Sequence, residues 1–224
     1  MNRIRSILLI IIIASFEMSA GAQVISEEAK RKVTVGFDVF TDIWQGKPSD
    51  MELRTINQAV NVFGLYNFPI NESNASLSVG LGIDNHNMYS NSRIHDVKAD
   101  TIKFVSIPSQ VDYRKSKVNY TYLDLPIEIK LRWKNGFKLV PGFKVGYLID
   151  SKQKYKGDRY DEQIMVKEKT KTIRQTEDWS YGFTLRIGYK IASLYGYYQI
   201  SDTFQKGRGP AMNPISIGIT ITPF

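Results

Sequence analysis

The chain has 224 residues, enough for one domain, and carries a net charge of +8 from 30 Lys and Arg residues and 22 Asp and Glu residues. It contains no cysteine, which excludes disulfides, thiol catalysis and cysteine-ligated metal sites. A net positive charge is typical of proteins that contact anionic lipid head groups or acidic surface polymers, and equally of a solvated surface without a partner.

The first 22 residues have the parts of a secretory signal peptide. Two arginines precede an apolar run from Ile7 to Phe16, which is shorter than the roughly 20 residues of a membrane-spanning helix. Ala20-Gly21-Ala22 then matches the small-residue cleavage pattern. We therefore expect residues 1–22 to be a signal peptide and residues 23–224 to form one exported domain, for which nucleic acid is not an expected partner.

The remainder of the chain alternates apolar and polar residues with a period of two. The clearest run is Tyr120 to Trp133, in which apolar side chains at every second position oppose Asp124, Glu128, Lys130 and Arg132. A helical stripe cannot produce this pattern. We predict eight strands, over 32–44, 56–68, 75–89, 118–133, 137–150, 178–191, 193–203 and 214–222. Since no later apolar stretch approaches the length of a spanning helix, a closed barrel is the structure that could cross a membrane.

The connections between these strands alternate in length. Lys134-Asn135-Gly136 is a strong hairpin signal, because Asn-Gly adopts the positive φ angles of a tight turn. The even connections are tight, whereas the odd ones, at 45–55, 90–117, 151–177 and 204–213, are longer. This is the pattern of outer-membrane barrels, which have short periplasmic turns and long extracellular loops. We interpret 151–177 as a solvated hairpin extension and 101–107 as part of a second hairpin beyond the membrane.

Alternation alone is compatible with two opposite arrangements. In a soluble exported lipocalin-like binder the apolar faces would enclose an apolar ligand, whereas in a membrane barrel they would face lipid. The polar faces here combine small residues with charges, so we predict that Asp124 and Glu128 pair with Lys130, Lys144 or Arg186 inside a narrow barrel. Aromatic residues near the strand ends are expected to form interfacial girdles. They are Trp44, Tyr66, Phe68, Tyr89, Trp133, Phe137, Trp179, Tyr189 and Phe204.

The chain ends on a strand whose last residue is Phe224. A terminal aromatic residue is typical of substrates of the outer-membrane assembly machinery, which we therefore expect as a partner beside outer-membrane lipid. The match is partial, because the alternate positions counted back from the end are Thr222, Thr220, Gly218 and Ser216 rather than apolar residues.

The run Tyr122-Leu123-Asp124-Leu125-Pro126-Ile127-Glu128-Ile129-Lys130 resembles a strand of the PorT-like outer-membrane β-barrel proteins. The following Pro141-Gly142-Phe143-Lys144-Val145-Gly146-Tyr147 is similar to their next, glycine-rich strand. The resemblance implies an eight-stranded outer-membrane barrel, in a family in which some members are linked to protein secretion. No catalytic residues define that family, so none are carried over.

Candidate catalytic chemistry is sparse. The two histidines, His86 and His95, lie near Asp84 and Asp96, but no nucleophile or oxyanion site accompanies them, and a metal site there is no better supported. We therefore predict a non-enzymatic protein without catalytic, cofactor or metal residues. An eight-stranded barrel is filled by its own side chains, so no open pore is expected. The function would then be that of a membrane scaffold, or of an accessory component whose long loops bind another envelope protein.

Overall fold

The computed structural model describes residues 32–70, 73–159 and 162–223. The predicted signal peptide, its cleavage site and Phe224 lie outside the described residues. The strands are β1 (Val33–Gln45), β2 (Gln58–Pro69), β3 (Ala75–Tyr89), β4 (Ser92–Ile94), β5 (Phe104–Ser106), β6 (Tyr113–Arg132), β7 (Phe137–Arg159), β8 (Glu162–Lys171), β9 (Trp179–Tyr189), β10 (Ala192–Gln199) and β11 (Asn213–Ile221). No helix among these residues is long and apolar enough to cross a membrane.

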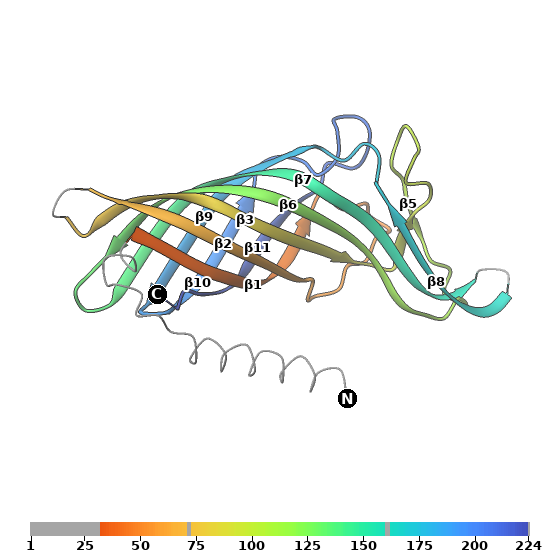
Figure 1. Ribbon diagram of the computed structural model, residues 1–224. Coiled ribbons are helices and arrows are strands. Elements are labelled where there is room, and N and C mark those ends of the chain that lie inside the picture. The colour runs from red at the N-terminus through yellow and green to blue at the C-terminus, as the bar shows by residue number, and fades with distance from the viewer. Residues whose placement is uncertain (1–31, 71–72, 160–161, 224) are drawn as a thin grey trace.

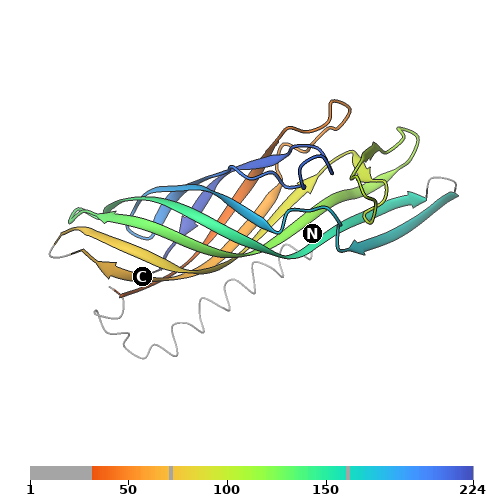
Figure 2. The same cartoon turned by 90° about the horizontal axis from the view of Figure 1, so that it is seen from above.

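Eight of the strands close into an antiparallel up-and-down barrel (Figure 1). The strands pair in the order β6-β3-β2-β1-β11-β10-β9-β7, in which the first and last strands of the chain, β1 and β11, are neighbours, and pairing of β6 with β7 closes the ring. The predicted fold class and the eight predicted strands are thereby confirmed. β8 lies outside the ring because it pairs only with the far part of β7. The strands cross the barrel at a marked tilt, as closure requires (Figure 2).

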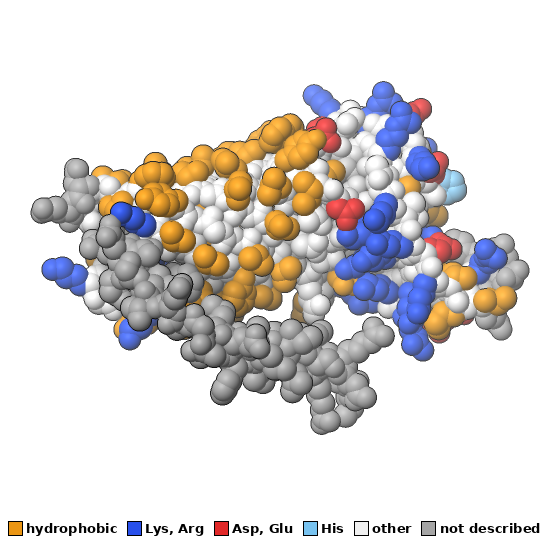
Figure 3. Space-filling model, in the orientation of Figure 1, with side chains coloured by type: hydrophobic (Ala, Val, Ile, Leu, Met, Phe, Trp, Pro, Cys, Tyr) orange, Lys and Arg blue, Asp and Glu red, His pale blue; other side chains and the backbone are white. Residues whose placement is uncertain are grey.

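The period of two places apolar side chains on the outside of the barrel. In β1, Val35, Phe37 and Val39 are exposed, whereas Thr34 and Asp38, which have the opposite parity, are buried. The same alternation in the other barrel strands produces an apolar band on the outside of the barrel, one side of which is seen in Figure 3. The soluble lipocalin-like alternative is therefore wrong, because the faces that would have lined its apolar cavity point away from the interior.

The two ends of the barrel differ. Tight turns at 133–136 and 190–191 lie at one end, here called the turn end, and the connections 46–57, 90–112, 172–178 and 200–212 lie at the other, the loop end. Long connections at one end and tight turns at the other are the asymmetry predicted from the connection lengths. Exposed aromatic residues such as Tyr66, Phe68 and Trp133 border the apolar band near the turn end, as a girdle does.

The loop end is closed by an apolar cap. Strands β4 and β5 form a short hairpin that packs over the barrel, so the predicted hairpin near 101–107 exists but does not project freely. Its buried cluster consists of Trp44, Met51, Met88, Ile94, Val97, Ile102, Val118, Tyr120, Tyr122, Ile173, Phe204 and Met212. Trp44 and Phe204 were expected in the girdle and are instead buried here. Trp44 has the same parity as the inward-facing Asp42, which explains its position.

The strands next to β8 are longer than predicted. β6 begins at Tyr113 rather than 118, and β7 continues to Arg159 rather than ending at 150. The register shifts by one residue where Thr121 pairs with Asp150 and Tyr122 with Leu148, which leaves Ile149 as a bulge. Beyond it the inward and outward positions of β7 exchange. β7 and β8 thus form the predicted hairpin extension, whereas β10 ends at Gln199, before the predicted 203.

Candidate functional site

The barrel interior is organised around buried charges contributed by several strands. Near the middle, the Arg186 guanidinium on β9 donates through Nη2 to Asp38 Oδ2 at 2.8 Å and through Nε to Thr220 Oγ1 at 3.0 Å, and it also pairs with Glu128. All of these side chains are buried. The predicted pair between Glu128 and Arg186 is confirmed, and Asp38 is a partner that the sequence pattern did not identify.

A second layer lies closer to the loop end. Lys144 on β7 forms ion pairs with Asp84 on β3 and with Asp124 on β6, the latter at 3.1 Å between Nζ and Oδ2. The predicted pairing of Asp124 with Lys144 is confirmed. Lys130, the third predicted cation, contacts Thr34 Oγ1 at 2.7 Å and Asn67 Oδ1 at 2.9 Å. Lys130 lies one inward position nearer the turn end than Glu128, and among the described residues it forms no ion pair with a carboxylate, so its predicted pairing is not found.

Glycines on β7 provide the space for these side chains. A Cβ atom on Gly146 would lie 2.4 Å from Asp124 Oδ1 and 2.5 Å from Ser180 Oγ. On Gly142 it would lie 2.7 Å from Thr184 Oγ1. Gly142 and Gly146 flank Lys144 on the inward face, so the glycine-rich pattern of this strand is a packing requirement of a narrow, filled interior.

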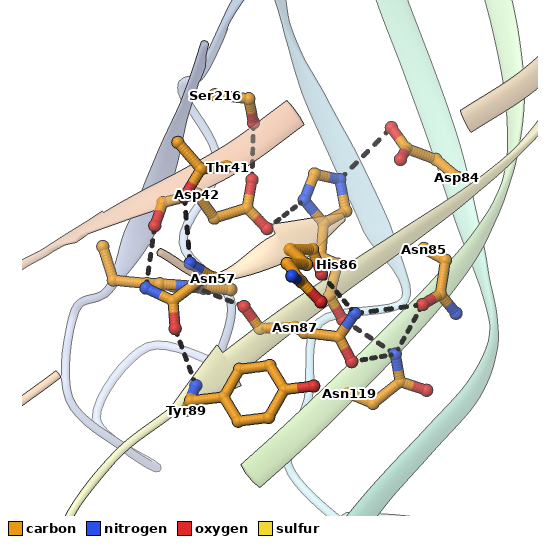
Figure 4. A network of polar contacts seen from close by, with 12 residues as sticks. Thr41, Asp42, Asn57, Asp84, Asn85, His86, Asn87, Tyr89, Asn119 and Ser216 are labelled. Carbon is orange, nitrogen blue, oxygen red and sulfur yellow. Dashed lines mark hydrogen bonds and ion pairs between the residues drawn. The ribbon is translucent and has the colours of Figure 1, made fainter. Parts of the chain in front are cut away.

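His86 lies on β3 between the inward-facing Asp84 and Met88, which belongs to the cap, and its polar contacts are drawn in Figure 4. Its Nδ1 is 3.0 Å from Asp42 Oδ2 and its Nε2 is 3.2 Å from Asp84 Oδ2. Both ring nitrogens can donate at once only in the protonated ring, so the geometry suits an imidazolium that bridges two carboxylates. Ser216 Oγ donates to Asp42 Oδ1 at 2.7 Å, on the side of the carboxylate away from the ring. The arrangement joins three strands and differs from a nucleophile–base pair, in which the hydroxyl contacts the imidazole.

The two histidines do not share a site. His86 is buried inside the barrel, whereas His95 is exposed in the connection between β4 and β5. Among the residues that the structure describes, no group of three or more His, Asp or Glu side chains is placed to hold a metal ion. The aspartates that neighbour each histidine in the sequence therefore differ in role: Asp84 binds Lys144 and His86, and Asp96 accepts a bond from the backbone of Lys98.

An asparagine belt marks the outer border of the apolar band. Asn119 Nδ2 donates to Asn85 Oδ1 at 2.9 Å and lies 3.2 Å from Asn87 Oδ1 (Figure 4). Lys117 donates to the same oxygen of Asn87. These residues have the outward parity of Leu123 on β6. The sequence Asp84-Asn85-His86-Asn87 could have indicated this border, because the outward positions change there from apolar to amide.

Comparison with known proteins agrees with this architecture. Residues 26–205 match the family described as outer membrane protein beta-barrel domain, and the chain belongs to that family. The protein is thus an outer-membrane β-barrel protein, as the sequence predicted.

One similar solved structure is the crystal structure of Ail, the attachment invasion locus protein of Yersinia pestis, in complex with the heparin analogue sucrose octasulfate. It is 10% identical in sequence, with a TM-score of 0.36, and the similarity covers 85% of this chain and 95% of that one. No curated protein matches the chain.

Proposed function

We propose that this protein is a closed, non-enzymatic scaffold or accessory component of the cell envelope, whose loop end binds another envelope protein. The observation that carries the proposal is the combination of a charged, filled interior with an ordered projection at the loop end. Layers centred on Arg186 and Lys144 occupy the interior, and the apolar cap covers them. A barrel of this size has little room beyond its own side chains.

Closure of the interior can be tested by conductance. Purified protein in a planar lipid bilayer should give no ion-conducting steps, because an ion would have to displace the cap and break the ion-paired layers. A variant in which Arg186, Lys144 and His86 are all replaced by Ala is the matched control, since it removes the charged side chains that fill the centre. Regular conductance steps from the natural protein would contradict the closed interior.

The β7–β8 hairpin is the surface that we propose meets the partner. It extends beyond the barrel at the loop end (Figure 1), and its tip exposes Ile164 by 57% and Met165 by 48%. Exposed apolar residues on an ordered projection are typical of protein contact sites. A photo-crosslinking residue at Met165 should yield a discrete adduct in intact cells, and the same residue at the exposed Asn135 of the turn end should not. Identical adduct patterns, or none at Met165, would contradict this assignment.

The resemblance to PorT-like proteins supports a secretion-linked role within this proposal. The motif from Tyr122 to Lys130 supplies outward residues of the apolar band, such as Leu125, and inward residues of the interior layers, such as Asp124 and Glu128. Those residues are accounted for by the structure of the barrel, so the secretion-linked role is supported by the resemblance alone. Deleting the gene and measuring export of secreted proteins across the outer membrane would test it: export should fall, and unchanged export would leave a scaffold role.

Export of the chain itself follows from the proposal. Removal of residues 1–22 and recognition of the remaining chain by the outer-membrane assembly machinery would deliver the barrel to its membrane. Amino-terminal sequencing of the protein from outer membranes should begin at Gln23, and a start at Met1 would show that the segment is kept.

A further inference from the structure

Lysine residues form an array on the outward face of the sheet beyond the barrel. Lys115 lies directly opposite Lys156 and Lys117 opposite Lys154, on β6 and β7. On the other side of β7, residues 152, 154 and 156 lie opposite lysines of β8. Directly paired residues of an antiparallel sheet share a face. This lysine ladder comprises Lys115, Lys117, Lys152, Lys154, Lys156, Lys167, Lys169 and Lys171.

The bulge at Ile149 creates the ladder. Without it, Lys152 and Lys154 would have the inward parity of Lys144. With it, they point outward while Gln153 between them turns toward the cap, where its Oε1 accepts from the backbone N–H of Ile94 at 2.5 Å. The lysines of β7 are therefore on the same surface as the lipid-facing side chains of the barrel.

Opposed like charges in a sheet are destabilising unless an opposite charge is nearby. Within the described part of the chain, the ladder has one ion pair to an acidic residue, between Lys152 and Asp150. Glu168 on β8 pairs with Arg93 instead. Burial, and then the neighbouring lysines, lower the pKa of Lys117 to about 8. The surface thus has uncompensated positive charge, which a bound anion would neutralise.

A hollow lies beside the ladder and includes an exposed apolar side chain. It has a volume of about 540 Å³ and is lined by residues that include Arg54, Ile56, Tyr89 and Lys115. The Arg54 guanidinium and the Lys115 and Lys117 amines lie 5.1, 5.6 and 5.0 Å from the centre of the Tyr89 ring. Ile56 is 63% exposed. The hollow therefore offers cations and an apolar surface at the same place.

The rung of the ladder nearest the barrel lies at the level of the head-group layer. Lys152 follows the exposed Ile149 by three residues, about 10 Å along a strand. Strands of such barrels tilt by about 35–45°, so Lys152 lies about 7–8 Å above the apolar band, near the outer edge of the lipid head-group region, and Lys154 and Lys156 lie farther out. Figure 3 shows Lys and Arg side chains gathered directly beyond the apolar band at this end.

We propose that the lysine ladder and the adjoining hollow bind the phosphate groups of anionic lipids in the leaflet around the loop end. The exposed Ile56 in the hollow and the exposed Ile149 beside the Lys152 rung favour a lipid over a soluble anion, because apolar side chains next to the cations would contact an acyl chain. The inference is independent of the proposed protein partner, which would contact the tip of the hairpin.

The test compares three probes and two variants. Protein in a zwitterionic detergent is titrated with short-chain phosphatidylglycerol, short-chain phosphatidylcholine and inorganic tripolyphosphate. The ladder variant replaces Lys117, Lys154 and Lys169 by Gln. The control variant replaces three exposed lysines of the loops at the same end, namely Lys98, Lys103 and Lys206. Migration on an unheated gel verifies that each variant is folded, and loss of like-charge contacts should leave the ladder variant at least as stable as the natural protein.

Phosphatidylglycerol should bind and phosphatidylcholine should not. Each lysine near an anionic surface contributes about fivefold in affinity, so the ladder variant should bind phosphatidylglycerol on the order of 100-fold more weakly, and the control variant as tightly as the natural protein. Equal binding of both lipids, an unchanged ladder variant, or an equal loss in the control variant would overturn the proposal. Tighter binding of tripolyphosphate than of phosphatidylglycerol would assign the ladder to a soluble polyanion and overturn the lipid assignment.

Discussion

The stability of the barrel interior depends on single charged residues that neutralise buried carboxylates. Arg186 lies between two buried carboxylates, Asp38 and Glu128. Its replacement by Met would leave both without a cation, and breaking such a buried pair costs about 3–5 kcal/mol. We expect a large fall in the urea midpoint for loss of the fast-migrating unheated form. Replacing Arg186, Asp38 and Glu128 together by Met, Asn and Gln should restore much of that midpoint, because no buried charge is then unpaired. A triple variant no more stable than the single one would contradict this account.

Gly146 provides a second test at this scale. A valine there would place its Cβ 2.4 Å from Asp124 Oδ1, so the carboxylate that binds Lys144 would have to move. Overpacking of this kind costs about 1–3 kcal/mol, and the urea midpoint should fall accordingly. Gly64 is the matched control, because a Cβ at that position meets nothing within 4 Å. If Gly146→Val and Gly64→Val lowered the urea midpoint equally, the interior would not be tightly packed around Gly146.

Lys117 gives the lipid site a pH dependence. Its pKa is lowered to about 8 by burial and by Lys115, Lys154 and Lys152, and its amine also lies over the ring of Tyr89. A bound phosphate favours the charged amine, so affinity for phosphatidylglycerol should be highest below pH 8 and weaken as the pH rises from 8 to 9.5. Arginine stays charged over this range, so Lys117→Arg should flatten the decline. An equally steep decline in the variant would exclude Lys117 as its source.

At the scale of elements, the bulge in β7 determines what the loop end presents. Deleting Ile149 would restore the parity of β7 beyond the bulge, turning Lys152 and Lys154 inward and Gln153 outward. The barrel segment of β7 up to Leu148 would keep its register with β9, so the heat-dependent gel shift should persist. The cap should loosen, however, and trypsin should cut the loop end faster. Deletion of Lys206, in a surface loop, is the control, and equal protease resistance in both deletions would contradict the role of the bulge.

The strands that alternate without interruption could be predicted from the sequence. The ranges 32–44, 75–89 and 214–222 agree with β1, β3 and β11 to within one residue. The bounds and facing of β7 beyond residue 150 could not be predicted, because the bulge at Ile149 interrupts the alternation from which strands are recognised. Only a hairpin somewhere in 151–177 was expected. Trp44 was assigned to the girdle from its place at a strand end, although its parity already placed it inside. Position along a strand fixes depth in the membrane, and parity alone fixes the face.

For the whole molecule, connection lengths and the chemistry of the two faces were sufficient to predict an outer-membrane barrel. The interior pairs of Asp124 and Glu128 could be anticipated because charges on an inward face need partners. Asp38 and Asp84, the further partners of Arg186 and Lys144, depend on which strands meet across the interior, and no local pattern specifies that. The cap could not be predicted either, because much of it is formed by connections whose sequences lack periodicity.

The central claim is a closed barrel with lipid-facing apolar strands, and one gel tests it directly. Outer-membrane fractions are prepared and the protein is detected after electrophoresis in SDS, with and without boiling. A closed barrel resists SDS until heated, so the unboiled protein should migrate faster than the boiled protein and should be found in this fraction. Protein found wholly in the soluble periplasmic fraction, with the same mobility before and after boiling, would contradict the account.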